Sequence, residues 1–346
     1  MVDGTPLRVG MISEVYGGTT PPEKYGGISA SVHDLSEEFV RRGHWVTLFA
    51  PEGSWSSGRL VVVPKGDRTS NVDGPLPPYV GRIIDGGYIR TIDVWIDGTH
   101  HKQFARYCKE AFPGVNVLCP SWNPNREDCP QNTVVQSPHM IKEMGKPEDT
   151  PFFYGGIRLE DYEPQYEADG NSVSINVLSV YKGTDLLVKA AAEHGFPVDL
   201  YGPCSNQRWF KKEIAPHIQT CRNIRWLGEC GKERIDIMRD AVASFTLATW
   251  PEPGSRASIE SFACGCPVIA LPSGCFPYYI ESDVNGVLCE GRDPDSIYDA
   301  YKRVIAGGSE MRRAARRTAE EKFDIHSRAE NYEALFKRMM EGDRWA

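Results

Sequence analysis

Two glutamates in the segment 250–275 have a spacing that suits the binding of a polyhydroxylated ligand. The segment reads WPEPGSRASIESFACGCPVIALPSGC, and seven residues separate Glu252 from Glu260. The Pro-Gly-Ser sequence at 253–255 favours a turn, and Ser255 is a good N-cap for a helix that begins near Arg256. Glu252 would therefore lie in the loop before the helix, and Glu260 about one turn inside it.

The start of this predicted helix offers a place for an anion. Free backbone N–H groups at residues 255–258 and the positive end of the helix dipole both favour a phosphate. A carboxylate on each side can accept hydrogen bonds from sugar hydroxyls, so a sugar nucleotide fits the segment. The spacing alone is commoner for two exposed charges at a helix end, because pairs of glutamates are frequent.

Two further segments place glycine or lysine at a predicted helix start. Gly26 and Gly27 follow the first strand and open the first helix, and paired glycines let a backbone approach a ligand closely. The pattern is not GxGxxG, so it does not support a dinucleotide fingerprint. Lys182 holds the equivalent position in the second half of the chain, where it can reach a diphosphate as a point charge.

The apolar pattern predicts alternating strands and helices in both halves. Predicted strands are 7–13, 44–51, 92–97, 115–120, 133–137, 173–179, 197–202, 223–228, 242–249 and 267–271. Predicted helices are 27–43, 101–112, 138–145, 184–195, 207–218, 232–241 and most of the chain after about 293. Residues 51–90 are rich in Gly, Pro and Ser and give no clear pattern. The alternating order implies parallel, doubly wound sheets.

The domain organisation follows from length and from a break in this pattern. A chain of 346 residues is expected to form two domains. The Gly-, Pro- and acid-rich stretch at about 150–171 suits an interdomain linker. We therefore expect two α/β, Rossmann-like doubly wound domains, residues 1–160 and 161–324, that face each other across a ligand-binding cleft.

The composition restricts the class of protein. Apolar residues make up 40% and charged residues 25%, which is ordinary for a soluble globular protein. The sequence has no long apolar run, so no membrane span is expected. It shows no signal-peptide pattern, so a cytoplasmic location is expected. The ten cysteines form no CxxC pair and no zinc-site spacing, so reduced thiols and no metal site are expected.

The charge balance argues against general affinity for nucleic acid. The formal net charge is −8. One cluster of arginines is basic despite this net charge. The spacing of its members predicts that they lie on one broad, solvated side of a helix. Its members are Arg312, Arg313, Arg316 and Arg317.

Over nearly its whole length, the chain resembles a family 4 glycosyltransferase, a retaining, nucleotide-sugar-dependent enzyme of the GT-B architecture. The segments PPEKYGGISASVHDLSEEFVRRGHWVTLFAP, VVQSPHMIKEMG and FFYGGIRLEDYEP are similar to its N-terminal glycine loop, pre-linker helix and linker. The segments KGTDLLVKAA, NIRWLG and PEPGSRASIESFACGCPVIA follow the order of its donor domain. Glu252 and Glu260 match its E-x7-E signature, which is specific when ACGxPVIA and NGxL follow it.

The resemblance implies a role for each candidate donor-binding residue. Glu260 would bind the ribose hydroxyls, Glu252 would contact the donor sugar at the catalytic centre, and Lys182 would neutralise the diphosphate. Gly26 and Gly27 would let the phosphates approach. Backbone amides of the second helix start would assist, and these belong to Gly254, Ser255, Arg256 and Ala257. No metal or other cofactor would be required, because lysine, amides and helix dipole supply the electrostatic stabilisation.

The chain departs from the family at two positions of this site. The Arg of the family's GRxxxxKG motif is absent and Ser179 stands near its position, so Arg256 is a candidate for the missing charge. The family's histidine after the fourth strand is also absent. His100 and His101 occur slightly later, either as catalytic residues or as polar caps of a helix.

The remaining expectations concern the acceptor and the C-terminus. The family lines its acceptor side with the region that corresponds to 120–130, although its residue types here equally suit an ordinary loop. The candidates are Trp122, Asn123, Asn125 and Arg126. The C-terminal helix, about 325–346, resembles one that packs back onto the first domain.

These observations predict an enzyme that transfers a sugar from a nucleotide-diphosphate sugar to an acceptor hydroxyl with retention. A sugar-nucleotide epimerase is a related alternative, but the intact E-x7-E signature argues against it. The missing Arg and His leave open an inactive or regulatory sugar-nucleotide-binding GT-B protein. A phage-type DNA glycosyltransferase, with a modified nucleic-acid base as acceptor, is a further alternative that the acidic net charge disfavours.

Overall fold

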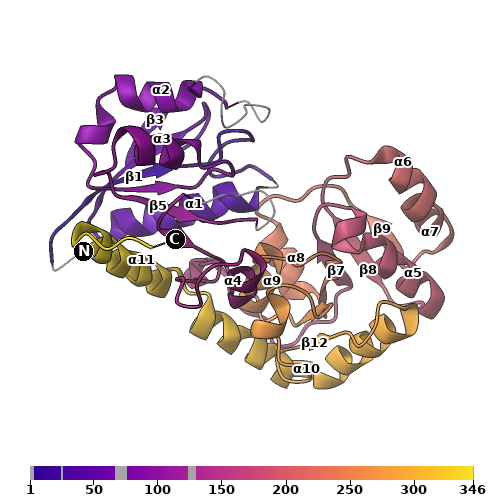
Figure 1. Cartoon of the computed structure of the whole chain (residues 1–346). Helices are drawn as coiled ribbons and strands as arrows, with labels where there is room; N and C mark the ends of the chain where they lie inside the picture. The colour runs from indigo at the N-terminus through magenta and orange to yellow at the C-terminus, as the bar shows by residue number, and fades with distance from the viewer. Residues whose placement is uncertain (1–3, 25, 67–75, 124–129, 346) are drawn as a thin grey trace. The chain divides into compact units, whose positions relative to one another are not determined.

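The computed structural model describes residues 4–24, 26–66, 76–123 and 130–345 (Figure 1). The chain divides into two compact units. Unit 1 comprises Met1–Gly156 and Ile325–Ala346, and unit 2 comprises Ile157–Asp324. The chain thus leaves unit 1 within the Gly- and acid-rich stretch and returns to it at the start of the last helix.

Unit 1 contains a parallel six-stranded sheet in the order β3-β2-β1-β4-β5-β6. Its strands are β1 Arg8–Ile12, β2 Trp45–Ala50, β3 Arg59–Val62, β4 Val94–Asp97, β5 Val117–Pro120 and β6 Thr133–Val134. Its helices are α1 Gly27–Arg41, α2 Pro78–Asp85, α3 Gln103–Ala111, α4 Pro138–Glu143 and α11 Ile325–Met340. The strand order reverses between β1 and β4, which makes that edge a topological switch point.

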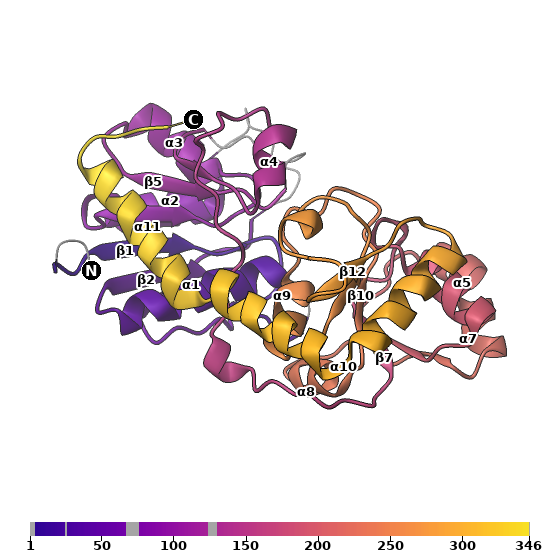
Figure 2. The ribbon, with the colours of Figure 1, turned by 90° about the horizontal axis from the view of Figure 1, so that it is seen from below.

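Helix α11 packs beside α1 in unit 1 (Figure 2). Aromatic rings of Phe39 and Phe336 lie 5.4 Å apart between the two helices. Glu333 of α11 accepts hydrogen bonds from Arg42 and His44, each at 2.8 Å. Burial opposes ionisation of Glu333, but these partners outweigh it and lower its pKa to about 2. Apolar packing and an ion pair therefore join the C-terminal helix to this unit.

Unit 2 contains a second parallel six-stranded sheet with the equivalent order, β12-β11-β10-β7-β8-β9. Its strands are β7 Ser172–Ile175, β8 Val198–Tyr201, β9 Ile224–Trp226, β10 Ser244–Thr246, β11 Val268–Ala270 and β12 Gly286–Leu288. Its helices are α5 Thr184–His194, α6 Gln207–Trp209, α7 Ala215–Thr220, α8 Arg234–Asp240, α9 Arg256–Ala263 and α10 Pro294–Lys322. The switch point of this sheet lies between β7 and β10.

The predicted class, a doubly wound α/β fold in both halves, is confirmed. Three elements were not predicted, β3, α2 and β12, and the first two fall in the Gly- and Pro-rich region 51–90. The helix expected at 207–218 contains a π-helical turn, Phe210–Ile214, between α6 and α7. Helix α10 is interrupted at Gly308, whose backbone is not helical. Among the described helices, none combines the length and apolar character that a membrane span requires.

The prediction that the arginine cluster of α10 forms a solvated face is wrong for two of its members. Arg312 is only 4% exposed and donates to the carbonyl oxygens of Gln165, Ala241 and Arg239 at 2.7–2.8 Å. Arg316 donates to two further carbonyl oxygens, each at 2.7 Å. Two of the Arg312 acceptors lie at the C-terminal end of α8, where helix carbonyls lack intrahelical partners. The other two arginines are exposed.

Candidate functional site

Lys182 and Glu252 form an ion pair beyond the carboxyl ends of β7 and β10. Nζ of Lys182 lies 2.6 Å from Oε2 of Glu252, and their side chains are 11% and 8% exposed. Lys182 ends a 3-10 turn before α5, and Glu252 lies in the loop before α9. Because β7 and β10 flank the switch point, the pair lies where ligands bind in doubly wound sheets.

Two glycines fix the backbone on which this pair is built. Gly183 has a φ of +66°, and a Cβ there would collide with the carbonyl oxygen of Leu247. Gly274 has a φ of +57°, and a Cβ there would collide with the backbone of Glu252. The N–H of Cys275 also donates to the Glu252 carbonyl oxygen at 2.8 Å. Only glycine permits these close approaches. Each loop therefore packs directly against the backbone of the other segment.

Two aromatic rings flank the lysine. Its Nζ lies 5.6 Å from the ring centroid of Trp250 and 6.0 Å from that of Tyr181. The rings meet edge to face at 6.3 Å, and Tyr181 is 47% exposed. Neither residue was predicted from the sequence, although Trp250 immediately precedes the Pro-Glu of the signature. These rings hold the ammonium group by cation–π attraction and leave an aromatic surface beside it.

Helix α9 begins as predicted, with Ser255 as its N-cap. The Ser255 side chain accepts from the N–H of Ser258 at 3.3 Å, so this one of the expected N–H groups is not available to a ligand. Gly254, Arg256 and Ala257 are partly exposed. The first turn of α9 therefore still offers backbone to an anion near Glu252.

Glu260 is enclosed by protein donors. It is 3% exposed, and its carboxylate accepts two hydrogen bonds from Arg234 and one from Arg256, each at 2.8 Å. Tyr162 donates a fourth at 3.0 Å. Burial opposes ionisation, but the charge of Arg256 and the bonds from Arg234 outweigh it and lower the pKa of Glu260 to about 2.

Glu260 can bind a ribose hydroxyl, as predicted, only if one of its protein donors is displaced. A carboxylate offers about four acceptor sites, and four protein donors already bind this one. A ribose hydroxyl would have to replace one of them, and Arg256 and Tyr162 donate one bond each, whereas Arg234 donates two. Arg234 and Tyr162 had no signal in the sequence, because they lie 26 and 98 residues away.

The glycine pair of unit 1 differs in what each member permits. A Cβ at Gly26 would collide with the ring of Pro22, so glycine at this position has a local packing reason. A Cβ at Gly27, the first residue of α1, would meet nothing within 4 Å among the described residues. Open space beside a helix start is compatible with the predicted approach of a phosphate.

The histidines and the tryptophan predicted for unit 1 lie around the end of β4. His100 Nε2 is 3.8 Å from Oε2 of Glu14, and the ring of His101 meets that of Tyr16 at 5.1 Å. Trp122 donates from Nε1 to the carbonyl oxygen of Gly98 at 2.9 Å. Asn123 follows it and is partly exposed. The remaining two acceptor candidates, Asn125 and Arg126, lie outside the described residues.

The predicted residues thus fall into separate groups. Unit 2 brings Lys182 to Glu252 and Arg256 to Glu260. The histidines and the tryptophan form their own group in unit 1.

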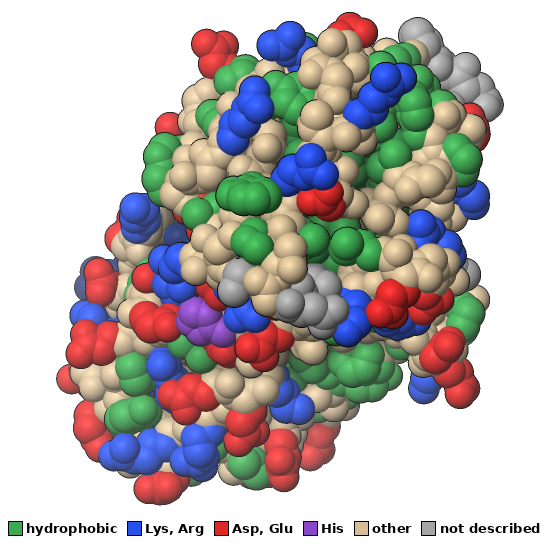
Figure 3. Space-filling model, turned by 90° about the vertical axis from the view of Figure 1, so that its left-hand side faces the viewer, with side chains coloured by type: hydrophobic (Ala, Val, Ile, Leu, Met, Phe, Trp, Pro, Cys, Tyr) green, Lys and Arg blue, Asp and Glu red, His purple; other side chains and the backbone are tan. Residues whose placement is uncertain are grey.

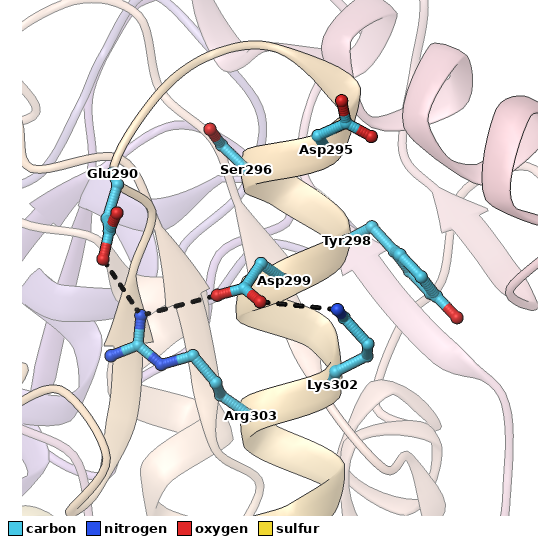
Figure 4. A pocket seen from close by; sticks show the side chains of 7 residues that line it. All are labelled: Glu290, Asp295, Ser296, Tyr298, Asp299, Lys302 and Arg303. Atoms are coloured by element: carbon cyan, nitrogen blue, oxygen red, sulfur yellow. Dashed lines mark ion pairs between the residues drawn. The ribbon is translucent and has the colours of Figure 1, made fainter.

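A surface pocket in unit 2 has different chemistry. Its volume is about 330 Å³, and it lies beside the first turns of α10 (Figure 4). Arg303 pairs with Glu290 at 3.8 Å and with Asp299 at 3.9 Å, while Lys302 pairs with Asp299 at 3.4 Å. These charges neutralise one another, and the pocket does not involve the ends of β7 and β10. We therefore place the candidate site at the Lys182–Glu252 pair.

One group of potential metal ligands occurs among the described residues, at the end of α5 opposite to Lys182. Its members are Glu193, His194 and Asp295, whose ligand atoms lie within 4.8 Å of one another. Both carboxylates are exposed, and Nε2 of His194 lies 3.2 Å from Asp295. This arrangement is that of a surface ion pair, and it takes no part in the candidate site.

Comparisons with solved structures agree with the two doubly wound sheets described above. The fold is that of solved GT-B glycosyltransferases. AviGT4, a glycosyltransferase involved in avilamycin A biosynthesis, superimposes with a TM-score of 0.77 at 23% identity, over 99% of this chain and 100% of that chain. Sucrose-phosphate synthase from Thermosynechococcus elongatus gives 0.79 at 16% identity, over 97% and 100%. Anabaena Alr3699/HepE in complex with UDP-glucose gives 0.71 at 15% identity, over 95% and 100%.

The match to a family model lies in unit 2. Residues 163–322, slightly less than half of the chain, match the model of the family described as glycosyl transferases group 1. D-inositol 3-phosphate glycosyltransferases of Thermobifida fusca and Corynebacterium jeikeium are 26% and 25% identical over 97 and 92 residues. These matches cover 28% and 27% of this chain and only 22% of the length of each relative. The predicted resemblance to GT-B glycosyltransferases is confirmed.

Proposed function

We propose that the chain transfers a sugar from a nucleotide-diphosphate sugar to an acceptor hydroxyl, with retention of configuration at the anomeric carbon. The observation that carries this proposal is the Lys182–Glu252 pair at the switch point of a glycosyl transferases group 1 domain. A diphosphate entering there would compete with Glu252 for the ammonium group. The released carboxylate would then accept a hydrogen bond from a hydroxyl of the donor sugar.

The proposed chemistry needs only groups that the domain supplies. Lys182 and backbone N–H groups of the first turn of α9 would neutralise the charge that develops on the leaving diphosphate. The bond between the anomeric carbon and the phosphate oxygen breaks, and the acceptor oxygen bonds to the same face of that carbon. The acceptor's proton passes to the departing diphosphate, so no separate protein base is required. Neither a metal ion nor another cofactor is part of this proposal.

An inactive sugar-nucleotide-binding protein is the second candidate. It is favoured by the occupied carboxylate of Glu260 and by Ser179, which stands near the position of the family's phosphate-binding arginine. Such a protein would bind the nucleotide sugar without releasing nucleoside diphosphate.

A nucleic-acid acceptor has lost part of its support. Arg312 and Arg316 donate to backbone carbonyl oxygens. The four arginines of α10 therefore do not form one basic surface. On the face of the molecule drawn in Figure 3, basic side chains are interspersed with acidic ones. This is not the basic patch or stripe typical of a nucleic-acid footprint.

The test is the release of nucleoside diphosphate from a panel of nucleotide sugars, first screened by thermal shift. We expect one donor to stabilise the protein and to be slowly hydrolysed with water as acceptor. Glu252→Gln should retain donor binding and lose release. NMR of the freed sugar reports its anomeric configuration before mutarotation. Binding without release would favour the inactive protein, and no binding by any donor would refute the proposal.

A further inference from the structure

The switch point of unit 1 carries a pair of side chains that matches the one in unit 2. Glu14 follows β1 and His100 follows β4, and these are the two strands between which the order of the sheet reverses. Lys182 and Glu252 follow the equivalent strands, β7 and β10, of the second sheet. In both units a carboxylate thus lies beside a nitrogen-bearing side chain at the edge where doubly wound sheets bind ligands, although the carboxylate follows the first of the two strands in unit 1 and the second in unit 2.

Glu14 is a buried carboxylate with one oxygen satisfied and one not. Its side chain is 10% exposed, and Oε1 accepts from the N–H of Tyr16 at 3.1 Å. Oε2 is buried and makes no hydrogen bond with any described residue. It faces Nε2 of His100 at 3.8 Å, which is beyond hydrogen-bond distance. A buried acceptor without a donor is costly, so this oxygen calls for a partner.

The surroundings hold both side chains in position. The hydroxyl of Tyr16 donates to the Gln103 side chain at 2.6 Å, which joins the loop after β1 to the start of α3. Asp97 accepts from the hydroxyl of Thr99 at 2.6 Å and from the N–H of Ala105 at 3.1 Å, which fixes the loop that carries His100. A subsite on such loops is preorganised for a ligand.

We propose that Glu14 and His100 form the subsite that binds a hydroxyl group of a carbohydrate or other polyol acceptor, an inference that rests on the proposed function. One hydroxyl oxygen about 2.8 Å from both atoms donates to Oε2 of Glu14 and accepts from Nε2–H of His100. The 3.8 Å separation admits a single oxygen between them. Glu14 thereby selects acceptors that carry a hydrogen-bond donor, and His100 binds the acceptor rather than the donor sugar.

Glycerol is a suitable probe, because it is a small polyol that can be added at molar concentration. The protein is incubated with glycerol and with the nucleotide sugar that it hydrolyses. The ratio of glycosyl-glycerol to free sugar is then measured. Glu14→Gln keeps the shape of the side chain but turns the acceptor that faces His100 into an N–H donor. We expect this ratio to fall about tenfold or more, since a hydrogen bond to a charged group is lost. Release of nucleoside diphosphate without glycerol is measured in parallel, so that any change in hydrolysis is separated from the change in the ratio.

Two controls make the outcome decisive. Glu23→Gln changes an exposed glutamate of the same loop and should leave the ratio unaltered. His100→Gln provides a second route to the subsite if Glu14→Gln does not fold. An unchanged ratio in the Glu14 variant, or a wild-type ratio no higher than the molar ratio of glycerol to water, overturns the assignment. If the wild type releases no nucleoside diphosphate at all, the proposed function itself fails, and the subsite with it.

Discussion

Replacement of Lys182 by methionine tests the chemistry of the site most directly. Methionine retains an unbranched apolar side chain beside Trp250 and Tyr181, so the packing changes little while the charge is lost. A charge-assisted hydrogen bond contributes about 1.5–3 kcal/mol. Loss of one predicts binding of nucleoside diphosphate that is weaker by about 10- to 100-fold. Binding of the parent nucleoside should be almost unaffected, because it has no phosphate.

The ion pair adds a second expectation. Without Lys182, the Glu252 carboxylate remains in place with a side chain only 8% exposed, and it would repel the diphosphate. The double variant Lys182→Met/Glu252→Gln should therefore bind nucleoside diphosphate more tightly than Lys182→Met alone. Groups in direct contact typically show coupling energies of about 0.5–3 kcal/mol, which isothermal titration calorimetry resolves.

The calorimetric cycle has a matched control on helix α5, which begins just after Lys182. Lys189 lies on α5, is 46% exposed and pairs with Glu213 at 3.6 Å, so Lys189→Met removes a surface charge of the same kind. It should leave the affinity for nucleoside diphosphate within error of the wild type. Equal weakening of nucleoside and nucleoside diphosphate by Lys182→Met would contradict a phosphate role. Independent, additive effects of the two substitutions would contradict the coupling.

Three further predictions concern the structure that supports the site. Glu260→Gln should lower the free energy of unfolding at neutral pH by about 3 kcal/mol, because the pKa of this carboxylate falls from 4.5 to about 2 on folding. Since the pKa is lower in the folded state, this contribution is present above pH 4.5 and is lost as the pH falls toward 2. Urea titrations of wild type and variant should therefore converge over that interval, and a constant difference would contradict the assignment. Gly183→Ala should cost much more stability than Gly195→Ala in thermal melts, since both positions have positive φ but only the first Cβ meets a backbone oxygen; equal costs would show that the collision is relieved. Arg312→Met should destabilise the protein by about 3 kcal/mol or more by leaving buried carbonyls without donors, whereas Arg317→Met, at an exposed position, should stay within about 0.5 kcal/mol. A small effect of the Arg312 change would mean that water replaces the guanidinium.

Much of the fold follows from the sequence because its signals are local. Apolar period and Gly and Pro punctuation located most strands and helices, and Ser255 specified the start of α9. Strand β3 and helix α2 gave no such signal, because β3 is short, with one buried residue of four, and both elements lie among loop-forming residues. Since parallel strands share one carboxyl edge, the order of elements alone brought Lys182 and Glu252 toward the same place.

The partners of the charged groups were decided only by the tertiary structure. Lys182 and Glu252 are 70 residues apart, and Arg312 reaches a carbonyl oxygen 147 residues away. The same holds for Arg234 and Tyr162, which bind Glu260 from 26 and 98 residues away, and for the unsatisfied oxygen of Glu14 opposite His100. The type of a residue determines which hydrogen bonds it can make. Which ones it makes depends on the groups that packing brings within about 3 Å of it, and at these separations along the chain no local pattern carries that information.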